Sequence, residues 1–412
     1  MAAQARVAIT GIGMITPVGN DTASSWAALR TGRTGIGLIS RFDTSRHDVK
    51  IAGEVKDFDP LAYMDRKEAR RTERFIHFAL VAARQAVDDA ELDVASMPDE
   101  VGVVMGSGSG GLGILEDQFR VLYDRGADRI SPLLITQMVP DMASGHLAMT
   151  FGARGPNFCT VSACATGAHA IGESYEIIKR GDARAMIAGG TEAGITSMTL
   201  AAFDSMHALS TRNDEPRRAS RPFDNLRDGF VMGEGAGVLV LEDFDLARAR
   251  GAQIYAEVLG YAASSDAHHI TEPAPGGTGL ARALRRALQK AELAPEAVGY
   301  INAHGTSTRF NDRDETAAIK SVFGEHAYKL AVSSTKSMTG HLMGAAGGVE
   351  IAITALALHD GVLPPTINYE VRDPECDLDY VPNTSREAPI RVALSNSMGF
   401  GGHNAVVVLG KV

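Results

Sequence analysis

The 412-residue sequence predicts an α/β fold built from two similar halves, and two patterns support this prediction. Short runs rich in apolar and β-branched residues alternate with longer stretches that have helical spacing. Several segments of the first half also resemble segments of the second half, which indicates an internal duplication. The predicted strands are 101–105, 185–188, 237–241, 298–303, 330–333 and 405–409.

Three pairs of segments support the duplication. In the first pair, TVSACATGAHA and AVSSTKSMTGH, a short strand runs through a turn of small residues into a helix, and in the third pair a glycine-rich loop leads into a strand. The pairs are 160–170 with 331–341 (TVSACATGAHA, AVSSTKSMTGH), 187–193 with 301–307 (IAGGTEA, INAHGTS), and 229–242 with 399–410 (GFVMGEGAGVLVLE, GFGGHNAVVVLG).

The charged stretch 242–250 marks the boundary between the two halves. We therefore divide the chain into an N-terminal half, 1–255, and a C-terminal half, 256–412. We expect the two halves to face each other across one site.

Composition excludes several classes of partner. The chain has 45% hydrophobic and 22% charged residues, so it can bury a substantial core. Its net charge of −10 argues against binding to nucleic acid or to an anionic membrane. We find no signal peptide, and no apolar stretch approaches the roughly 20 residues that span a membrane. We therefore expect a cytoplasmic protein without a nucleic-acid or membrane partner.

The cysteines point to chemistry rather than to disulfides. Cys159, Cys164 and Cys376 are odd in number and lack paired spacing, so at least one thiol is free. A helix is predicted to begin within 165–167 and to end at Gly181. Cys164 then lies at the positive end of this helix, which predicts a lowered thiol pKa and a better nucleophile.

Taken singly, these residues have ordinary explanations. A lone cysteine is more often a small core residue than a nucleophile. A lone histidine after a strand, such as His304, is more often a structural hydrogen-bonding group. His341 lies at the start of a predicted helix that runs from about Leu342 to His359. Because three reactive residues occur at repeat-related turns, we interpret them together as one catalytic site.

Four motifs carry a family resemblance over nearly the whole chain. SACATGAHA, NAHGTST, STKSMTGHLMGAAG and NSMGFGGHN, in this order, resemble the β-ketoacyl-acyl carrier protein synthases, and among them the synthase II type. The resemblance implies the thiolase fold, with duplicated βαβαβ halves in five layers (α/β/α/β/α), normally as a homodimer. Thiolases themselves are disfavoured, because Cys376 lacks the glycine-rich setting of their second catalytic cysteine.

The resemblance implies a decarboxylative Claisen condensation, catalysed by a transferase of fatty-acid biosynthesis. Cys164 would hold an acyl group as a thioester, with the backbone N–H groups of Cys164 and Phe400 as the oxyanion hole. Neutral His304 and His341 would donate hydrogen bonds to the enolate formed from malonyl-acyl carrier protein. No free cofactor and no metal are implied, because phosphopantetheine on the acyl carrier protein carries the substrates.

Further residues match family positions around this site. Lys336 is interpreted as a buried, ion-paired residue with an electrostatic role rather than as a solvated lysine. Thr306 and Thr308 match positions that hydrogen-bond the phosphopantetheine arm. Phe400 matches a gate at the acyl pocket, where glycines permit loop movement. The candidate carboxylate partners of Lys336 are Asp312, Glu315 and Glu350, and the glycines beside the gate include Gly399 and Gly401.

A basic segment suggests a docking surface for the acidic carrier protein. If 66–74 is one helix, its basic residues at i, i+4 and i+8 share a face. A solvated helix face explains this pattern equally well. Arg66, Arg70 and Arg74 have this spacing, and the docking surface also includes Lys67 and Arg71.

Other functions have weaker support. Gly106, Gly108 and Gly111 satisfy the G-x-G-x-x-G pattern of dinucleotide-binding proteins, but no acidic residue ends a strand at the required distance. A non-catalytic partner subunit of a ketosynthase heterodimer is a second alternative. Such subunits replace the nucleophile, whereas Cys164 is present in this chain.

Four departures from the usual motifs leave the pathway open. Ser109 stands where a bulky isoleucine commonly lines the acyl pocket, and Met398 stands in place of phenylalanine. Arg309-Phe310 and His403 are further departures. We hypothesise an altered acyl chain, so a ketosynthase of a specialised polyketide or polyene pathway stays an alternative. The sequence also leaves open whether the enzyme pairs with itself or with a ketosynthase-like subunit.

Overall fold

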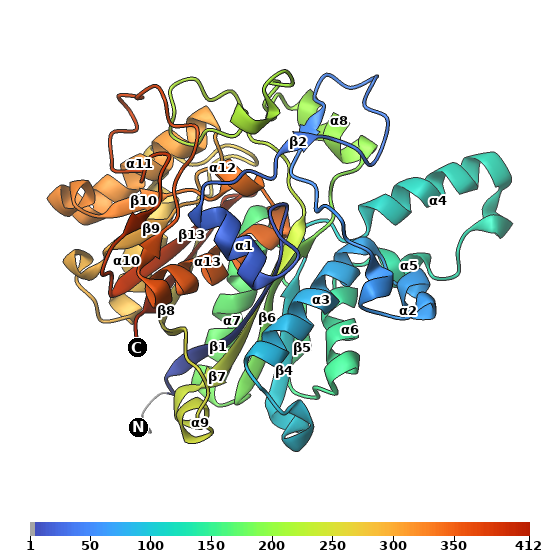
Figure 1. The fold of residues 1–412 in the computed structure, drawn as a ribbon, viewed down its shortest axis with the longest axis horizontal. Helices are drawn as coiled ribbons and strands as arrows, with labels where there is room; N and C mark the ends of the chain where they lie inside the picture. The colour runs from blue at the N-terminus through green and yellow to red at the C-terminus, as the bar shows by residue number, and fades with distance from the viewer. Residues whose placement is uncertain (1–4) are drawn as a thin grey trace.

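The structure, a computed structural model, describes residues 5–412. One mixed sheet of ten strands organises it, in the order β10-β9-β13-β14-β8-β1-β7-β6-β4-β5 (Figure 1). The strands are β1 (Val7–Ile15), β4 (Val101–Gly106), β5 (Asn157–Phe158), β6 (Ala185–Glu192), β7 (Gly235–Asp243), β8 (Ala256–Ser265), β9 (Tyr300–Asn302), β10 (Ala331–Ser333), β13 (Val392–Gly399) and β14 (His403–Gly410). All six predicted strands are therefore present.

The sheet is two copies of one topology joined at its centre. In each half the strands lie in the order third, second, fourth, fifth, first, counted along the chain. Parallel pairs on the outer side of each half give way to antiparallel pairs towards the centre. β1 and β8 join the halves through an antiparallel pair in which Val7 lies opposite Val258. This arrangement confirms the predicted duplication.

One of the three sequence pairings is wrong. Segment 187–193 lies on β6, the fourth strand of its half, whereas 301–307 follows β9, the second strand of its half. The counterpart of β9 is β4. The two segments look alike because each is a buried strand that ends in small residues, not because they occupy equivalent positions. The sequence did hold a sign of this mismatch: 187–193 comes after 160–170 in the first half, whereas 301–307 comes before 331–341 in the second.

Helices complete five layers (Figure 1). α7 (Thr166–Arg180) and α13 (Ala346–Asp360) form the inner layer, and each contacts strands of both halves. The outer layers are α3 (Arg74–Asp89) with α6 (Met142–Phe151), and α10 (Thr278–Lys290) with α11 (Arg309–Phe323). The thiolase architecture implied by the motifs is confirmed.

Strand periodicity explains how both faces of the sheet are buried. Along β7, Leu239 and Leu241 pack into the inner core with α7 and α13, whereas Val238 and Val240 pack into the outer core with α3. Successive side chains of a strand point to opposite faces, so a continuous apolar run suits a sheet that is covered on both sides.

The remaining elements are short or lie around this body. α7 ends at Gly181 as predicted, but α13 begins at Ala346 rather than near Leu342, because 343–345 forms a 3₁₀ turn. α4 projects from the body on the side of β5 (Figure 1). The remaining helices and strands are α1 (Thr22–Arg30), β2 (Gly37–Leu38), β3 (Ile51–Ala52), α2 (Arg66–Arg71), α4 (Leu112–Arg125), α5 (Leu134–Met138), α8 (Ser197–Ser205), α9 (Phe244–Ala249), α12 (Lys336–Thr339), β11 (Val362–Leu363) and β12 (Arg386–Glu387).

None of the helices within 5–412 is both long and apolar enough to cross a membrane.

Glycines let the inner layer approach the sheet closely. A Cβ atom built on Gly190 of β6 would lie 2.3 Å from the carbonyl oxygen of Gly344. A Cβ on Gly167 of α7 would lie 2.6 Å from the backbone nitrogen of Gly348 on α13. Side chains at these positions would force the two halves apart just below the pocket.

We expect Gly190→Ala to destabilise the protein by roughly 1–3 kcal/mol, because the added methyl overpacks a contact between backbones. Gly145→Ala on α6 is the matched control, since nothing lies within 4 Å of its Cβ position. There alanine should stabilise the helix by roughly 0.5–1 kcal/mol. Urea unfolding of both variants measures the difference, and equal midpoints would contradict the packing argument.

Candidate active site

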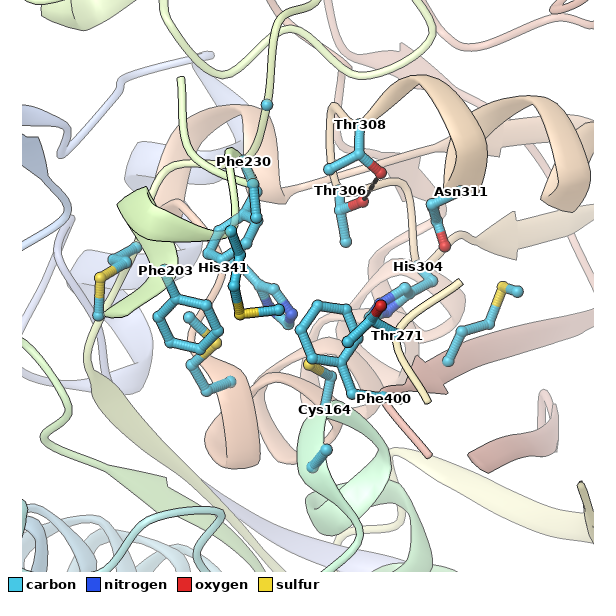
Figure 2. Close-up of a pocket in the computed structure, with 18 of the residues that line it drawn as sticks. Cys164, Phe203, Phe230, Thr271, His304, Thr306, Thr308, Asn311, His341 and Phe400 are labelled. Carbon is cyan, nitrogen blue, oxygen red and sulfur yellow. Dashed lines mark hydrogen bonds between the residues drawn. The ribbon is translucent and has the colours of Figure 1, made fainter. Parts of the chain in front are cut away.

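Cysteine and histidine side chains from both halves line one pocket (Figure 2). Cys164 comes from the N-terminal half, and His304, His341 and Phe400 come from the C-terminal half. The cysteine sulfur and one nitrogen of each histidine all lie within 4.8 Å of one another. The structure thus brings together the nucleophile and both histidines predicted from the sequence.

Local turns aim these groups into the pocket. Cys164 sits in a 3₁₀ turn that leads into α7, directly after Ala163, whose φ is +50°. Positive φ is uncommon for a residue with a side chain and marks a tight turn. His304 follows β9, where its backbone N–H donates to Glu315 at 2.8 Å. The backbone N–H of His341 donates to the carbonyl of Val231 at 2.7 Å.

The predicted lowering of the Cys164 pKa is wrong. Burial raises the pKa of this thiol to about 12, although the Lys336 charge and the backbone of Phe400 oppose the shift. Removing the thiol from water disfavours the charged form more than the helix end and Lys336 favour it. Cys164 is therefore a thiol at neutral pH, and its proton must move to a base during attack.

Both histidines are neutral. Burial lowers the pKa of His304 and of His341 well below 6.5, and the charge of Lys336 lowers both further. Lys336 Nζ lies 3.4 Å from His304 Nδ1. An ammonium only donates, so Nδ1 accepts and the proton of His304 sits on Nε2. Within 5–412, neither ring nitrogen of His341 has a hydrogen-bond partner, so this imidazole is available to a substrate.

Lys336 is buried and ion-paired, as the sequence predicts, and its partner is Glu350. Glu315 instead accepts from the backbone N–H groups of His304 and Gly305 and so holds the histidine loop. Asp312 is not a partner of Lys336. It accepts from the backbone N–H groups of Ser307 and Phe223, and it lies 3.5 Å from Arg227.

The loop that carries Phe400 completes the pocket beside the nucleophile. Phe400 lines the pocket beside Cys164 (Figure 2). A Cβ on Gly399 would lie 2.7 Å from the carbonyl oxygen of Ser162 and 3.1 Å from the backbone nitrogen of Cys164, so glycine is required there. Gly401 has a φ of +86°, which also favours glycine. The backbone nitrogen atoms of Cys164 and Phe400 therefore lie near each other.

Five of the six predicted substrate-binding residues line this same pocket, and Gly401 is the one that does not: the five are Ser109, Thr306, Thr308, Met398 and Gly399. The hydroxyls of Thr306 and Thr308 lie 3.0 Å apart and are hydrogen-bonded (Figure 2). Ser109 lines the wall, and its hydroxyl donates to the buried carboxylate of Glu192.

The basic segment is not one helix. α2 ends at Arg71, Thr72 is extended, and α3 begins at Arg74, so the predicted single face is wrong. Arg74 turns inward and binds the buried Glu234 at 2.6 Å. The other four residues stay exposed on α2: Arg66, Lys67, Arg70 and Arg71.

Two supporting residues were missed by the sequence analysis. Glu192 accepts from the backbone N–H groups of Gly108 and Gly344, which ties the two halves together beside the pocket. Arg227 donates to the backbone carbonyls of Thr308 and Arg309. Glu192 lies four residues beyond the predicted strand 185–188, and that position was the only signal for it.

The donor atoms of Cys164, His304 and His341 are types that bind zinc, and this is the one group in 5–412 whose spacing could hold a metal ion. The Lys336 ammonium beside His304 opposes a second cation there.

Comparison with known proteins gives consistent matches over the whole chain. Sequence models described as "Beta-ketoacyl synthase, N-terminal domain" and "Beta-ketoacyl synthase, C-terminal domain" match residues 4–247 and 255–370. A protein of Synechocystis sp. named 3-oxoacyl-[acyl-carrier-protein] synthase 2 is 55% identical over 407 residues, covering 98% of both chains. Its namesake from Staphylococcus aureus strain COL is 52% identical and covers 100% of this chain and 99% of its own.

Solved structures agree with these matches. A β-ketoacyl synthase from Burkholderia phymatum has a TM-score of 0.92 at 36% identity, covering 99% of this chain and 100% of its own. The ishigamide ketosynthase/chain length factor also has a TM-score of 0.92 at 36% identity, covering 100% of both chains.

We expect alkylation of Cys164 by iodoacetamide to keep accelerating as the pH rises from 6 to 9.5, because the raised pKa leaves only a small thiolate fraction throughout this range. Peptide mass spectrometry after short exposures measures the rate at Cys164 itself. In unfolded protein, the same cysteine should level off near the ordinary thiol pKa of about 8.5. A plateau below pH 8 in the folded protein would contradict the raised pKa.

Proposed function

Since this chain belongs to the β-ketoacyl synthase family, a family of condensing acyltransferases, we propose that Cys164, His304 and His341 carry out its reaction. Its function is the elongation of fatty acyl chains held on an acyl carrier protein, in the manner of the synthase 2 relatives. The observation that supports the catalytic assignment is the convergence of one sulfur and two imidazoles within 4.8 Å.

The first step transfers an acyl group to Cys164. The thiol loses its proton to a neighbouring neutral imidazole as the sulfur attacks the thioester carbonyl. The negative charge that develops on oxygen is stabilised by the backbone N–H groups of Cys164 and Phe400. The phosphopantetheine thiolate leaves and takes up the proton, which restores the neutral imidazole.

The second step forms the carbon–carbon bond. Malonyl-acyl carrier protein loses carbon dioxide, and negative charge moves to its thioester oxygen as an enolate. His304 donates from Nε2 and His341 donates from its free ring N–H, so both stabilise this charge. The enolate carbon attacks the Cys164 thioester, the sulfur leaves and takes up a proton from solvent to become a thiol again, and a 3-oxoacyl chain longer by two carbons is released on the carrier.

The reaction needs no free cofactor, because the carrier protein delivers both substrates on phosphopantetheine. Thr306 and Thr308 line the pocket with paired hydroxyls, which supports their assignment to the polar arm of phosphopantetheine. Phe400 is proposed as the gate between this arm and the acyl pocket.

The pathway has a second candidate. Ser109 leaves space in the pocket wall, and the exposed Phe310 lines the same pocket, which favours an unusual acyl chain and hence a specialised polyketide or polyene pathway. The solved complex AntDE:AntF, a type II polyketide acyl-carrier protein bound to its ketosynthase, matches this chain at 34% identity. This identity is well below that of the synthase 2 relatives. Primary fatty-acid elongation is therefore our first assignment. The retained Cys164 argues against a non-catalytic subunit.

Assembly and location stay predictions. β5 lies at the edge of the sheet with Phe158 exposed, and an unpaired edge strand is a ready surface for a second chain. Tyr123 and Ile135 add exposed apolar surface on α4 and α5. These features support the homodimer, with a ketosynthase-like partner as the alternative. The cytoplasmic location rests on the sequence expectation.

The condensing reaction is tested by mixing the enzyme with an acyl-carrier protein and a malonyl-carrier protein and measuring intact masses. We expect a 3-oxoacyl carrier with two added carbons, and no such product with Cys164→Ala. Cys159→Ala is the control and should retain activity. Failure to form either product or acyl-Cys164 would contradict the proposed function.

Carrier docking is tested by charge reversal on α2. We expect Lys67→Glu with Arg70→Glu to raise the KM for acyl-carrier protein about tenfold, because the exposed cations no longer attract an acidic partner. Activity on a small acyl thioester without a carrier should stay unchanged. Arg286→Glu on α10 is the control on a distant face. An equal KM for all three proteins would exclude α2 as the dock.

Chain selection is tested at Ser109. Isoleucine there would fill the pocket wall and break the hydrogen bond to Glu192, so Ser109→Ile should lose branched or long acyl substrates at least tenfold. Short straight chains serve as the internal control. A panel in which the unaltered enzyme prefers ordinary straight chains, with no change in Ser109→Ile, would exclude the specialised pathway.

A further inference from the structure

His169, on the second turn of α7, is a half-buried residue that the proposed reaction does not use. Its Nδ1 lies 2.6 Å from the hydroxyl oxygen of Ser162. The same ring packs against the ring of His403, the first residue of β14. His169 therefore bridges a segment of the N-terminal half and a segment of the C-terminal half.

At one end of this bridge lies the nucleophile turn. Ser162 is two residues before Cys164, separated from it by Ala163 with its φ of +50°. The backbone N–H of Ser162 donates to the hydroxyl of Thr166 at 2.8 Å. Because the turn is strained and short, the anchoring of Ser162 fixes the direction of the Cys164 backbone N–H.

At the other end lies the strand that follows the Phe400 loop. β14 begins at His403, and a Cβ on Gly401 would lie 3.0 Å from His403 Nε2. The His403 ring packs against His169 with centroids 6.3 Å apart and planes at 89°. The position of Asn404 and His403 therefore sets where the loop places the backbone N–H of Phe400.

The contacts of His169 suit the neutral form of its ring. Burial and the nearby His403 lower the pKa of His169 to about 4, so the ring is neutral at neutral pH. The Ser162 hydroxyl can then donate to Nδ1, which leaves the ring proton on Nε2.

We propose that His169 is a positioning residue that holds the backbone N–H groups of Cys164 and Phe400 in register as an oxyanion hole. It does not touch the substrate and acts through Ser162 on one side and β14 on the other. This inference rests on the proposed function, because an oxyanion forms only if Cys164 attacks a thioester.

The test compares two reactions of the same sulfur. Acyl transfer from an acyl-carrier protein to Cys164 develops an oxyanion, whereas alkylation by iodoacetamide does not. In His169→Leu we expect acyl transfer to slow at least tenfold, since loss of an oxyanion donor costs about 10²–10³ in rate and here it is displaced. Alkylation should stay within about twofold. Intact mass at timed intervals measures both rates.

Four further variants locate the effect. Ser162→Ala should slow acyl transfer as His169→Leu does. The double variant should be no slower than the slower single variant, because both substitutions remove the same hydrogen bond. His169→Asn keeps an acceptor for Ser162 and should recover part of the rate. Tyr261 packs beside His169, and its hydroxyl hydrogen-bonds Glu173. Tyr261→Phe is therefore the control and should leave both rates unchanged.

Two results would overturn the inference. Unchanged acyl transfer in His169→Leu would show that the bridge does not position the oxyanion hole. An equal fall in acyl transfer and alkylation would show a general structural role. If the unaltered enzyme is alkylated but never acylated, the proposed function itself fails, which is a distinct outcome.

Discussion

The ion pair between Lys336 and Glu350 lies inside the protein beside His304, and the electrostatics of the whole site depend on it. The lysine charge lowers the pKa of both histidines and opposes the effect of burial on the Cys164 pKa. Glu350 is what allows that charge to exist away from water, since an unpaired buried ion costs about 3–5 kcal/mol. The pair thus adds to the effect of burial, which is the larger cause of the lowered histidine pKa values.

The duplicated fold explains how these groups meet. The N-terminal half supplies Cys164 at the start of α7, and the C-terminal half supplies both histidines and Phe400. α7 and α13 lie side by side as the inner layer, so both helices begin near the pocket. Glycines at their crossing let the two halves approach within backbone contact. The burial that raises the Cys164 pKa is a direct result of this close packing.

Much of this arrangement could be predicted from the sequence, because it follows from local pattern and from motifs. The strands and the end of α7 at Gly181 could be predicted from local residue patterns, and the buried Lys336 could be predicted from the family motif. The pKa of Cys164 could not be predicted, since burial depends on chains that pack from both halves. The inward turn of Arg74 could not be predicted either, because its partner Glu234 lies 160 residues away.

The central claim is that burial and Lys336 keep His304 and His341 neutral, so that both donate hydrogen bonds to the enolate. Nitrogen-15 NMR of histidine-labelled enzyme, titrated from pH 5 to 8, tests this claim most directly, with His304→Ala and His341→Ala to assign the signals. We expect both signals to stay at neutral-imidazole shifts across this range, because each pKa lies well below 6.5. A signal that titrates near pH 6.5 would contradict the account.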